Sequence, residues 1–128
     1  MDSLDFNAYL RAGSLQLDDA ELLVLLVNGA AQVRSRIAER KGLDIETLFG
    51  CSKDRSALVR AAVAANPATP LEILRVLADD PNLDLKYSMA ENHNLPLEIL
   101  EKLSSDDNPY IHNRATRTME RLERQRSH

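Results

Sequence analysis

The side chains best suited to chemistry form two charged columns that share one spacing. A basic side chain recurs every 26 residues, at Arg34, Arg60, Lys86 and His112. Six residues before each of them stand Asn28, Asp54, Asp80 and Asp106. Such a ladder could hold an acidic partner or phosphate groups. Alternatively, each cation pairs with the aspartate that ends the preceding unit, or caps its carbonyl groups, and so fixes the stacking. Because the two columns match, we favour the structural role for this charged ladder.

Residues 110–128 carry a second concentration of positive charge. The arginines follow i, i+3, i+7 and i+10 and would share one face of a helix: Arg114, Arg117, Arg121 and Arg124. This arginine face could contact an acidic protein or nucleic acid. The net charge of −4 argues against nucleic acid. A solvated helix end is the simpler interpretation, because cations are favourable near a helix C-terminus.

No group of residues matches a catalytic constellation. The three histidines lack metal-ligand spacing, and the sequence has no glycine-rich phosphate loop. Cys51 is the single cysteine, which excludes a disulfide framework and a cysteine-based metal cluster. It falls at a leucine position of the repeat, so we expect a small buried apolar side chain. The sequence therefore predicts no catalytic, cofactor-binding or metal-binding residue, and a protein that is not an enzyme.

A sequence repeat positions these residues. The segment from Val59 to Asn66 returns as 85–92, and the segment from Pro70 to Leu77 returns as 96–103, both after 26 residues. A fixed period of this size predicts stacked structural units. The chain has no tryptophan and few aromatic residues, and its leucine and alanine content favours closely packed helices. We predict an all-α solenoid of about four two-helix units.

Each unit is predicted to contain two short helices. The first, or A segment, carries leucines three residues apart, as at Leu71, Leu74 and Leu77. Thr69 to Glu72 forms a capping-box pattern with Pro70 at the first helical position. Asp18 and Asp44 offer similar starts. The A segments cover 18–27, 44–51, 70–78 and 96–104, and the B segments cover 31–40, 57–65, 83–91 and 109 onward.

The two ends of the chain depart from the repeat. Residues 2–12 are predicted to form a capping helix with Ser3 as its N-cap, and the last B segment becomes a longer closing helix. We interpret the chain as one domain with a cap (1–17), repeats (18–109) and a closing helix (110–128). The stretch Leu22–Val27 is apolar on every side of its helix. Either the N-terminal helix encloses it, or it leaves a patch for association with a second copy.

The unit at 59–81 carries the residues of a known repeat. They are Val59, Arg60, Val63, Ala64, Asn66, Pro67, Thr69, Pro70, Glu72, Leu74, Leu77, Ala78, Asp80 and Pro81. This pattern resembles the leucine-rich repeat variant, a HEAT-like helical repeat. The resemblance is good at 85–106 and looser at 33–54 and 18–28. It implies a right-handed superhelix in which α-helices alternate with shorter, partly 3₁₀ segments. Some members carry an iron–sulphur module on a cysteine cluster, which a single cysteine does not support here.

The leading functional hypothesis is a non-enzymatic protein–protein interaction module or scaffold. Exposed positions that vary between units would contact a protein partner of unknown identity: Arg36, Arg40, Tyr87, Glu91, Asn113, Arg114, Arg117, Arg121 and Arg124. The alternative is nucleic-acid binding through the arginine face. We find no secretory signal and no apolar run long enough for a membrane span. We therefore expect a cytoplasmic protein without a cofactor.

Overall fold

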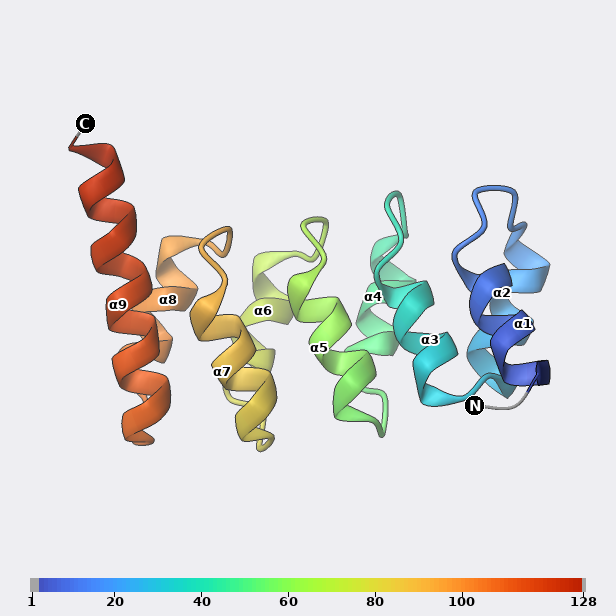
Figure 1. Ribbon diagram of the computed structural model, residues 1–128, viewed down its shortest axis with the longest axis horizontal. Coiled ribbons are helices and arrows are strands. Elements are labelled where there is room, and N and C mark those ends of the chain that lie inside the picture. The colour runs from blue at the N-terminus through green and yellow to red at the C-terminus, as the bar shows by residue number, and fades with distance from the viewer. Residues whose placement is uncertain (1–2, 128) are drawn as a thin grey trace. The chain divides into compact units, whose positions relative to one another are not determined.

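The computed structural model describes residues 3–127, and all regular structure in that range is helical. The chain divides into two compact units, Met1–Ala68 and Thr69–His128. The first unit contains α1 (Ser3–Ala12), α2 (Asp19–Asn28), α3 (Ala31–Ala38), α4 (Ile45–Cys51) and α5 (Ala57–Ala65) (Figure 1). The second contains α6 (Leu71–Leu77), α7 (Leu83–Glu91), α8 (Leu97–Leu103) and α9 (Pro109–Arg126). The predicted all-α fold is confirmed. The repeat number, the superhelix hand and the single domain stay predictions.

The A helices are α2, α4, α6 and α8, and each follows an N-cap at the same position of the repeat. Asp18 accepts a hydrogen bond from the Glu21 amide at 2.8 Å, and Asp44 accepts one from the Thr47 amide at 2.7 Å. Pro70 occupies the N-cap position of α6 with φ −65° and ψ 156°. The prediction that Thr69 caps and Pro70 is the first helical residue was therefore wrong by one position. The fixed φ of proline is compatible with an extended N-cap as well as with a first helical turn.

Before each of the B helices α5, α7 and α9, two polar side chains accept hydrogen bonds from backbone amides. Ser56, Asn82 and Asn108 are the N-caps, and each side chain accepts a backbone amide of its own first turn. Two residues earlier, the carboxylates of Asp54, Asp80 and Asp106 accept the amides of these cap residues at 2.8–2.9 Å. Short polar side chains that bind nearby amides stabilise turns and helix starts.

The core consists of the same positions repeated from unit to unit. Four sets of equivalent positions, 26 residues apart in the sequence and called columns here, are buried: Val33, Val59, Leu85 and Ile111; Ile37, Val63, Met89 and Ala115; Ala12, Ala38, Ala64 and Ala90; Leu48, Leu74 and Leu100. The alanine column permits close approach of neighbouring helix ends. It includes Ala12, so the end of α1 follows the repeat register.

Two expectations about individual segments are corrected. The regular segments within residues 3–127 are α-helical, so the 3₁₀ character that the resemblance implied is not found there. The apolar helix α2 is not enclosed: Leu23, Val24 and Val27 are 61%, 55% and 71% exposed. Its other face packs against the core of the first unit through Leu22, Leu25 and Leu26. The predicted cap function of the Ser3 side chain, and residue 2 of the predicted helix, lie outside the described residues.

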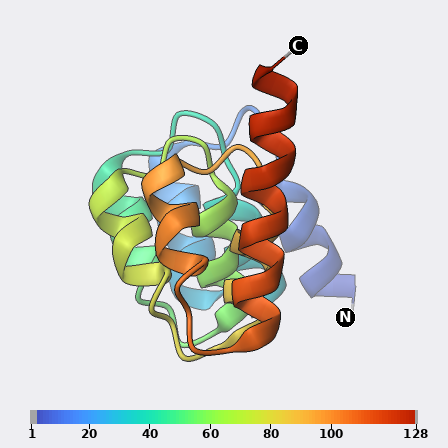
Figure 2. The same ribbon diagram turned by 90° about the vertical axis from the view of Figure 1, so that its left-hand side faces the viewer.

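The closing helix is the longest, with 18 residues. It packs on α7 and α8 and runs on past the end of α8 (Figure 1, Figure 2). Among residues 3–127, no helix combines the length and the apolar character that a membrane crossing needs.

Candidate functional site

The basic residues of the charged ladder contact aspartates and backbone carbonyls of the protein itself. Arg34 donates from Nε to Oδ2 of Asp54 at 2.8 Å and from Nη2 to Oδ1 at 3.0 Å. The two side chains are only 7% and 14% exposed. A third guanidinium nitrogen, Nη1, donates to the carbonyl of Gly29 at 2.7 Å. Burial alone would raise the pKa of Asp54, but the bonds from Arg34 and from the Ser56 amide outweigh it and hold that pKa below its ordinary value.

The second unit repeats this arrangement with a lysine. Lys86 contacts the carboxylate of Asp106, and both side chains are nearly as buried as the arginine pair. Burial of Asp106 is again outweighed, here by Lys86 and by the Asn108 amide, so its pKa is also lowered. Arg60 donates to the carbonyl of Asp54 at 2.8 Å, and the ring of His112 contacts the carbonyl of Ser104.

These contacts reverse the predicted direction of the ladder. We expected each cation to pair with the acidic residue six positions before it, but Arg34 and Lys86 pair with the aspartate 20 positions after them. The reason is the packing of B helices: α3 lies against α5, and α7 lies against α9. Each aspartate sits in the turn before the later helix of its pair. The part of the prediction that assigned carbonyl capping to these cations agrees with the bonds of Arg34 and Arg60.

A second polar column, which we did not identify from the sequence, binds the carbonyl ends of the B helices. Asn66 donates to the carbonyls of Ala38 and Arg40 at 2.8 and 3.1 Å. Thr118, two periods after Asn66, donates to the carbonyl of Ala90 at 2.6 Å. The last carbonyls of a helix lack intrahelical partners, so these donors satisfy groups that would otherwise be buried without one. The recurrence of Asn66 at a fixed spacing could have revealed the column.

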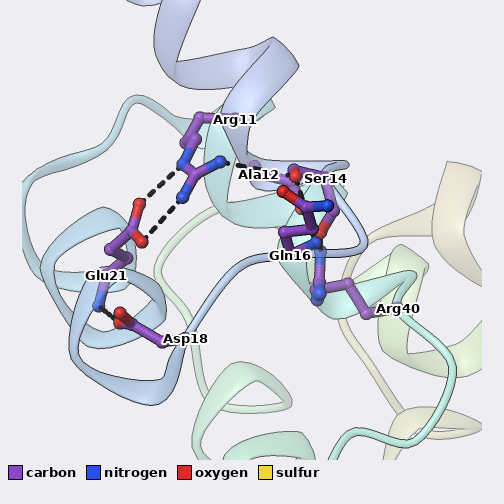
Figure 3. A network of polar contacts seen from close by, with 7 residues as sticks. All are labelled: Arg11, Ala12, Ser14, Gln16, Asp18, Glu21 and Arg40. Carbon is purple, nitrogen blue, oxygen red and sulfur yellow. Dashed lines mark hydrogen bonds and ion pairs between the residues drawn. The ribbon is translucent and has the colours of Figure 1, made fainter.

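Arg40, one period before Asn66, holds the corresponding place at the end of α1. Its Nη1 donates to the carbonyls of Ala12 and Ser14, both at 2.7 Å (Figure 3). Nearby, Arg11 makes a two-pronged ion pair with Glu21 at 2.6 and 2.7 Å, which joins α1 to α2. The hydrogen bonds from Arg11 are the main reason that the pKa of Glu21 is lowered. Arg40, which we predicted to contact a partner, therefore holds the end of α1.

Arg36 also makes a structural contact within the first unit. Its guanidinium carbon lies 4.1 Å from the centre of the Tyr9 ring, a stacking contact that arginine favours. A Cβ at Gly13 would come within 2.2 Å of Arg36 Nε, so the guanidinium would have to shift if a larger residue stood there. The Nε atoms of Arg36 and of Arg114, its counterpart three periods later, are buried without a hydrogen-bond partner among the described residues.

The other predicted contact residues lie together on the second unit. Tyr87 and Glu91 are exposed on α7, and Asn113, Arg117, Arg121 and Arg124 are exposed on α9, which packs against it. Tyr110, which was not predicted from the sequence as a contact residue, continues the arginine face by one turn and is 75% exposed. Within residues 3–127, Arg117, Arg121 and Arg124 make no ion pair. A separate cavity of about 620 Å³ opens between α8 and α9, lined by Leu95, Leu97, Met119 and Leu122.

The cysteine and the potential metal ligands show no sign of catalytic chemistry among the described residues. Cys51 is 5% exposed, and burial, the main cause, raises the pKa of its thiol to about 11. It is therefore a neutral thiol at physiological pH, unlike a nucleophilic cysteine. Among the described residues, no three histidine, cysteine or acidic side chains converge in a way that could hold a metal ion.

Repeated helix pairs with matching buried columns define an all-α repeat protein. The family model described as leucine rich repeat variant matches residues 57–82, which comprise α5, α6 and the turns around them. The resemblance seen in the sequence is confirmed for residues 57–82. No curated protein and no solved structure matches the chain.

Proposed function

We propose that this chain is a non-enzymatic interaction module that binds an acidic segment of a partner protein on the outer face of α7 and α9. The leucine rich repeat variant match supports a repeat-type interaction module. Repeat proteins keep their buried positions constant and bind through exposed positions that differ between units. That division is present here, since the columns of Val59 and Val63 are buried whereas positions 87, 91, 113 and 117 carry four different exposed residue types.

The observation that carries the proposal is the row of exposed side chains along α9. Tyr110, Arg117, Arg121 and Arg124 share one face, and the three arginines are not neutralised by ion pairs within the described residues. Tyrosine and arginine are the residue types that most often dominate protein interfaces. Their charge selects a partner segment that is rich in aspartate or glutamate.

A photo-crosslinking amino acid at Arg121 tests this proposal, with the same substitution at Arg55, an exposed arginine of the first unit, as the matched control. We expect one protein to be crosslinked from Arg121 and not from Arg55 in lysate of the native cell. The purified partner should then bind the chain directly, and Arg117→Glu with Arg121→Glu should weaken binding by at least about tenfold. Equal crosslinking from both positions, or binding that survives the charge reversal, would contradict the proposal.

Nucleic-acid binding is the second candidate, because the same arginines could contact phosphates. A fluorescence titration against duplex DNA, single-stranded DNA and RNA at two salt concentrations separates the two. Nucleic acid predicts an affinity that falls steeply as salt is raised, with a slope set by the number of phosphates contacted. The net charge of −4 is unfavourable for binding a polyanion such as nucleic acid.

A further inference from the structure

A groove in the first unit lies between the A helices α2 and α4. It has a volume of about 340 Å³ and is lined by Leu23, Leu26, Glu46, Thr47, Gly50 and Cys51. Leu23 provides an aliphatic wall that is 61% exposed. Glu46, also exposed, provides the carboxylate.

The second unit differs at the corresponding positions, where side chains bridge α6 and α8 beside a cavity of about 450 Å³ that Ala78, Lys102 and Asp106 help to line. Two periods after Leu23 and Glu46 stand Arg75 and Glu98. Arg75 reaches from α6 to α8 and donates to both carboxylate oxygens of Glu98, at 2.6 and 3.1 Å. Lys102, the counterpart of Gly50, donates to Asp79 at 2.7 Å and to the carbonyl of Arg75 at 3.1 Å. The chain therefore bridges α6 and α8 with its own side chains.

The first unit keeps the acceptor of that bridge and lacks the donors. Glu46 retains the carboxylate, and no cation of the described residues forms an ion pair with it. Leu23 replaces the arginine, and Gly50 removes the lysine side chain. A Cβ built on Gly50 would meet no atom within 4 Å, so packing does not require glycine there. Glycine inside a helix is unfavourable relative to alanine, so this residue leaves the groove open at a cost in stability.

The charges around the groove define its occupant. Asp54 also borders it, but both of its carboxylate oxygens already bind Arg34. The thiol of Cys51 is neutral, so Glu46 is the anionic group that remains available. One cation with an aliphatic stem matches this combination, and arginine fits better than lysine because its planar guanidinium binds a carboxylate through two hydrogen bonds.

We propose that the groove between α2 and α4 binds an arginine, flanked by aliphatic residues, from a segment of a partner protein. The stem of the arginine lies along Leu23 and Leu26, and its guanidinium binds Glu46 in the manner of Arg75 and Glu98. The aliphatic neighbours of that arginine contact the exposed side chains of Val24 and Val27 on α2. This inference rests on the proposed function in that the occupant is a protein, but it concerns another surface.

The test uses the peptide acetyl-Ala-Leu-Arg-Leu-Ala-amide as probe and follows the backbone amides of the full chain by ¹⁵N NMR. We expect saturable shifts confined to α2 and α4. A matched peptide with glutamine in place of arginine should bind at least about fivefold more weakly, because it loses the charge-assisted bonds. Equal binding of the two peptides, or shifts spread over both units, would overturn the proposal.

Two variants locate the site. Glu46→Gln should weaken binding of the arginine peptide to the level of the glutamine peptide, whereas Glu98→Gln, the matched control in the second unit, should leave it unchanged. Leu23→Arg supplies the missing donor within the chain and should abolish binding while the circular dichroism spectrum stays unchanged. Undiminished binding to either groove variant would overturn the proposal.

The same variants separate this proposal from its alternatives. Sedimentation that shows a dimer broken by Leu23→Arg would assign the groove to a second copy and overturn the assignment to a partner protein. Loss of partner binding in the α9 charge-reversal variant, with the peptide still bound in the groove, would leave both proposals standing. If partner binding depends on α9 and the peptide does not bind at all, the groove proposal is overturned and the α9 proposal is not.

Discussion

The two units place different side chains at the same positions between neighbouring A helices. In the second unit, Arg75 and Lys102 bind Glu98 and Asp79 across the junction of α6 and α8. In the first unit the positions of those two cations hold Leu23 and Gly50, and a groove remains between α2 and α4. The buried leucines are nevertheless equivalent, since Leu48 and Leu100 are both fully buried. The exposed positions of this repeat can therefore change while its buried positions stay the same.

A second contrast concerns how deeply the ion pairs lie. The Arg75 and Glu98 side chains are 49% and 52% exposed, whereas Arg34 and Asp54 are 7% and 14% exposed. An exposed pair is solvated before and after it forms, so it contributes little to stability. A buried pair cannot lose one member without leaving a desolvated charge behind. The exposed positions are therefore free to change for binding, whereas the charged ladder is not.

The largest expected effect comes from breaking the buried pair. Arg34→Ala should lower the free energy of unfolding by about 3 kcal/mol, because Asp54 would stay mostly buried without its cation. Arg75→Ala, which removes an exposed partner, should change it far less. Urea denaturation followed by circular dichroism measures both variants. Similar losses in the two variants would remove the contrast between buried and exposed pairs.

Acid should act on the ladder in a predictable direction. The pKa values of Asp54 and Asp106 are lowered in the folded protein, so both carboxylates contribute stability above the ordinary aspartate pKa of about 3.9. That contribution is lost as the pH falls through the lowered folded values. We expect the free energy of unfolding to decline below about pH 4.

The variant Asp54→Asn supplies the control for this pH dependence. It should be less stable than the natural sequence at neutral pH and should lose less stability on acidification, because one linked proton is gone. Denaturation curves at a series of pH values measure the slope. An unchanged acid slope in Asp54→Asn would mean that this carboxylate does not carry the effect.

Two glycines sharpen the difference between open and closed sites. Gly50→Ala should stabilise the protein by about 0.5–1 kcal/mol, because the added methyl group enters open space and the unfolded chain loses entropy. Gly29→Ala should destabilise it, because the new Cβ would lie 2.4 Å from the carbonyl oxygen of Leu25. Thermal and urea denaturation measure both. A destabilising Gly50→Ala would show that the groove wall is already filled.

The smallest effect on stability is expected from removing the ion pair between α6 and α8. In the folded protein, the hydrogen bond from Arg75 is the main reason that the pKa of Glu98 is lowered. Arg75→Leu, which copies the first unit, should return that pKa toward its ordinary value while the denaturation midpoint barely moves. Carboxyl ¹³C NMR during a pH titration measures this shift. A pKa that stays low in Arg75→Leu would assign the effect to another group.

The helices could be predicted because their signals are local and repeated. The predicted A and B segments lie within about two residues of the observed helices, the usual uncertainty of helix boundaries. The acidic starts at Asp18 and Asp44 were recognised, because an N-cap contacts its own first turn. Pro70 was predicted to be the first residue of its helix but is the N-cap, because proline is compatible with both positions.

Contacts between successive helices were less predictable. The ladder residues were identified from their period, but Arg34 was assigned to the wrong neighbour along the chain. The acceptors of Asn66 and Thr118 are backbone carbonyls, which leave no mark in the residue types. The apolar sequence of α2 suggested enclosure, whereas its exposure depends on how far α1 extends over it.

The sequence by itself determined the repeat, the helices and the residues that form the core, because periodic burial and helix capping act over a few neighbouring positions. The tertiary structure decided which aspartate each cation binds, which arginines are held by structural contacts and where a groove stays open. Those outcomes depend on distances between helices more than ten residues apart, and side chains of similar type can satisfy them in more than one way.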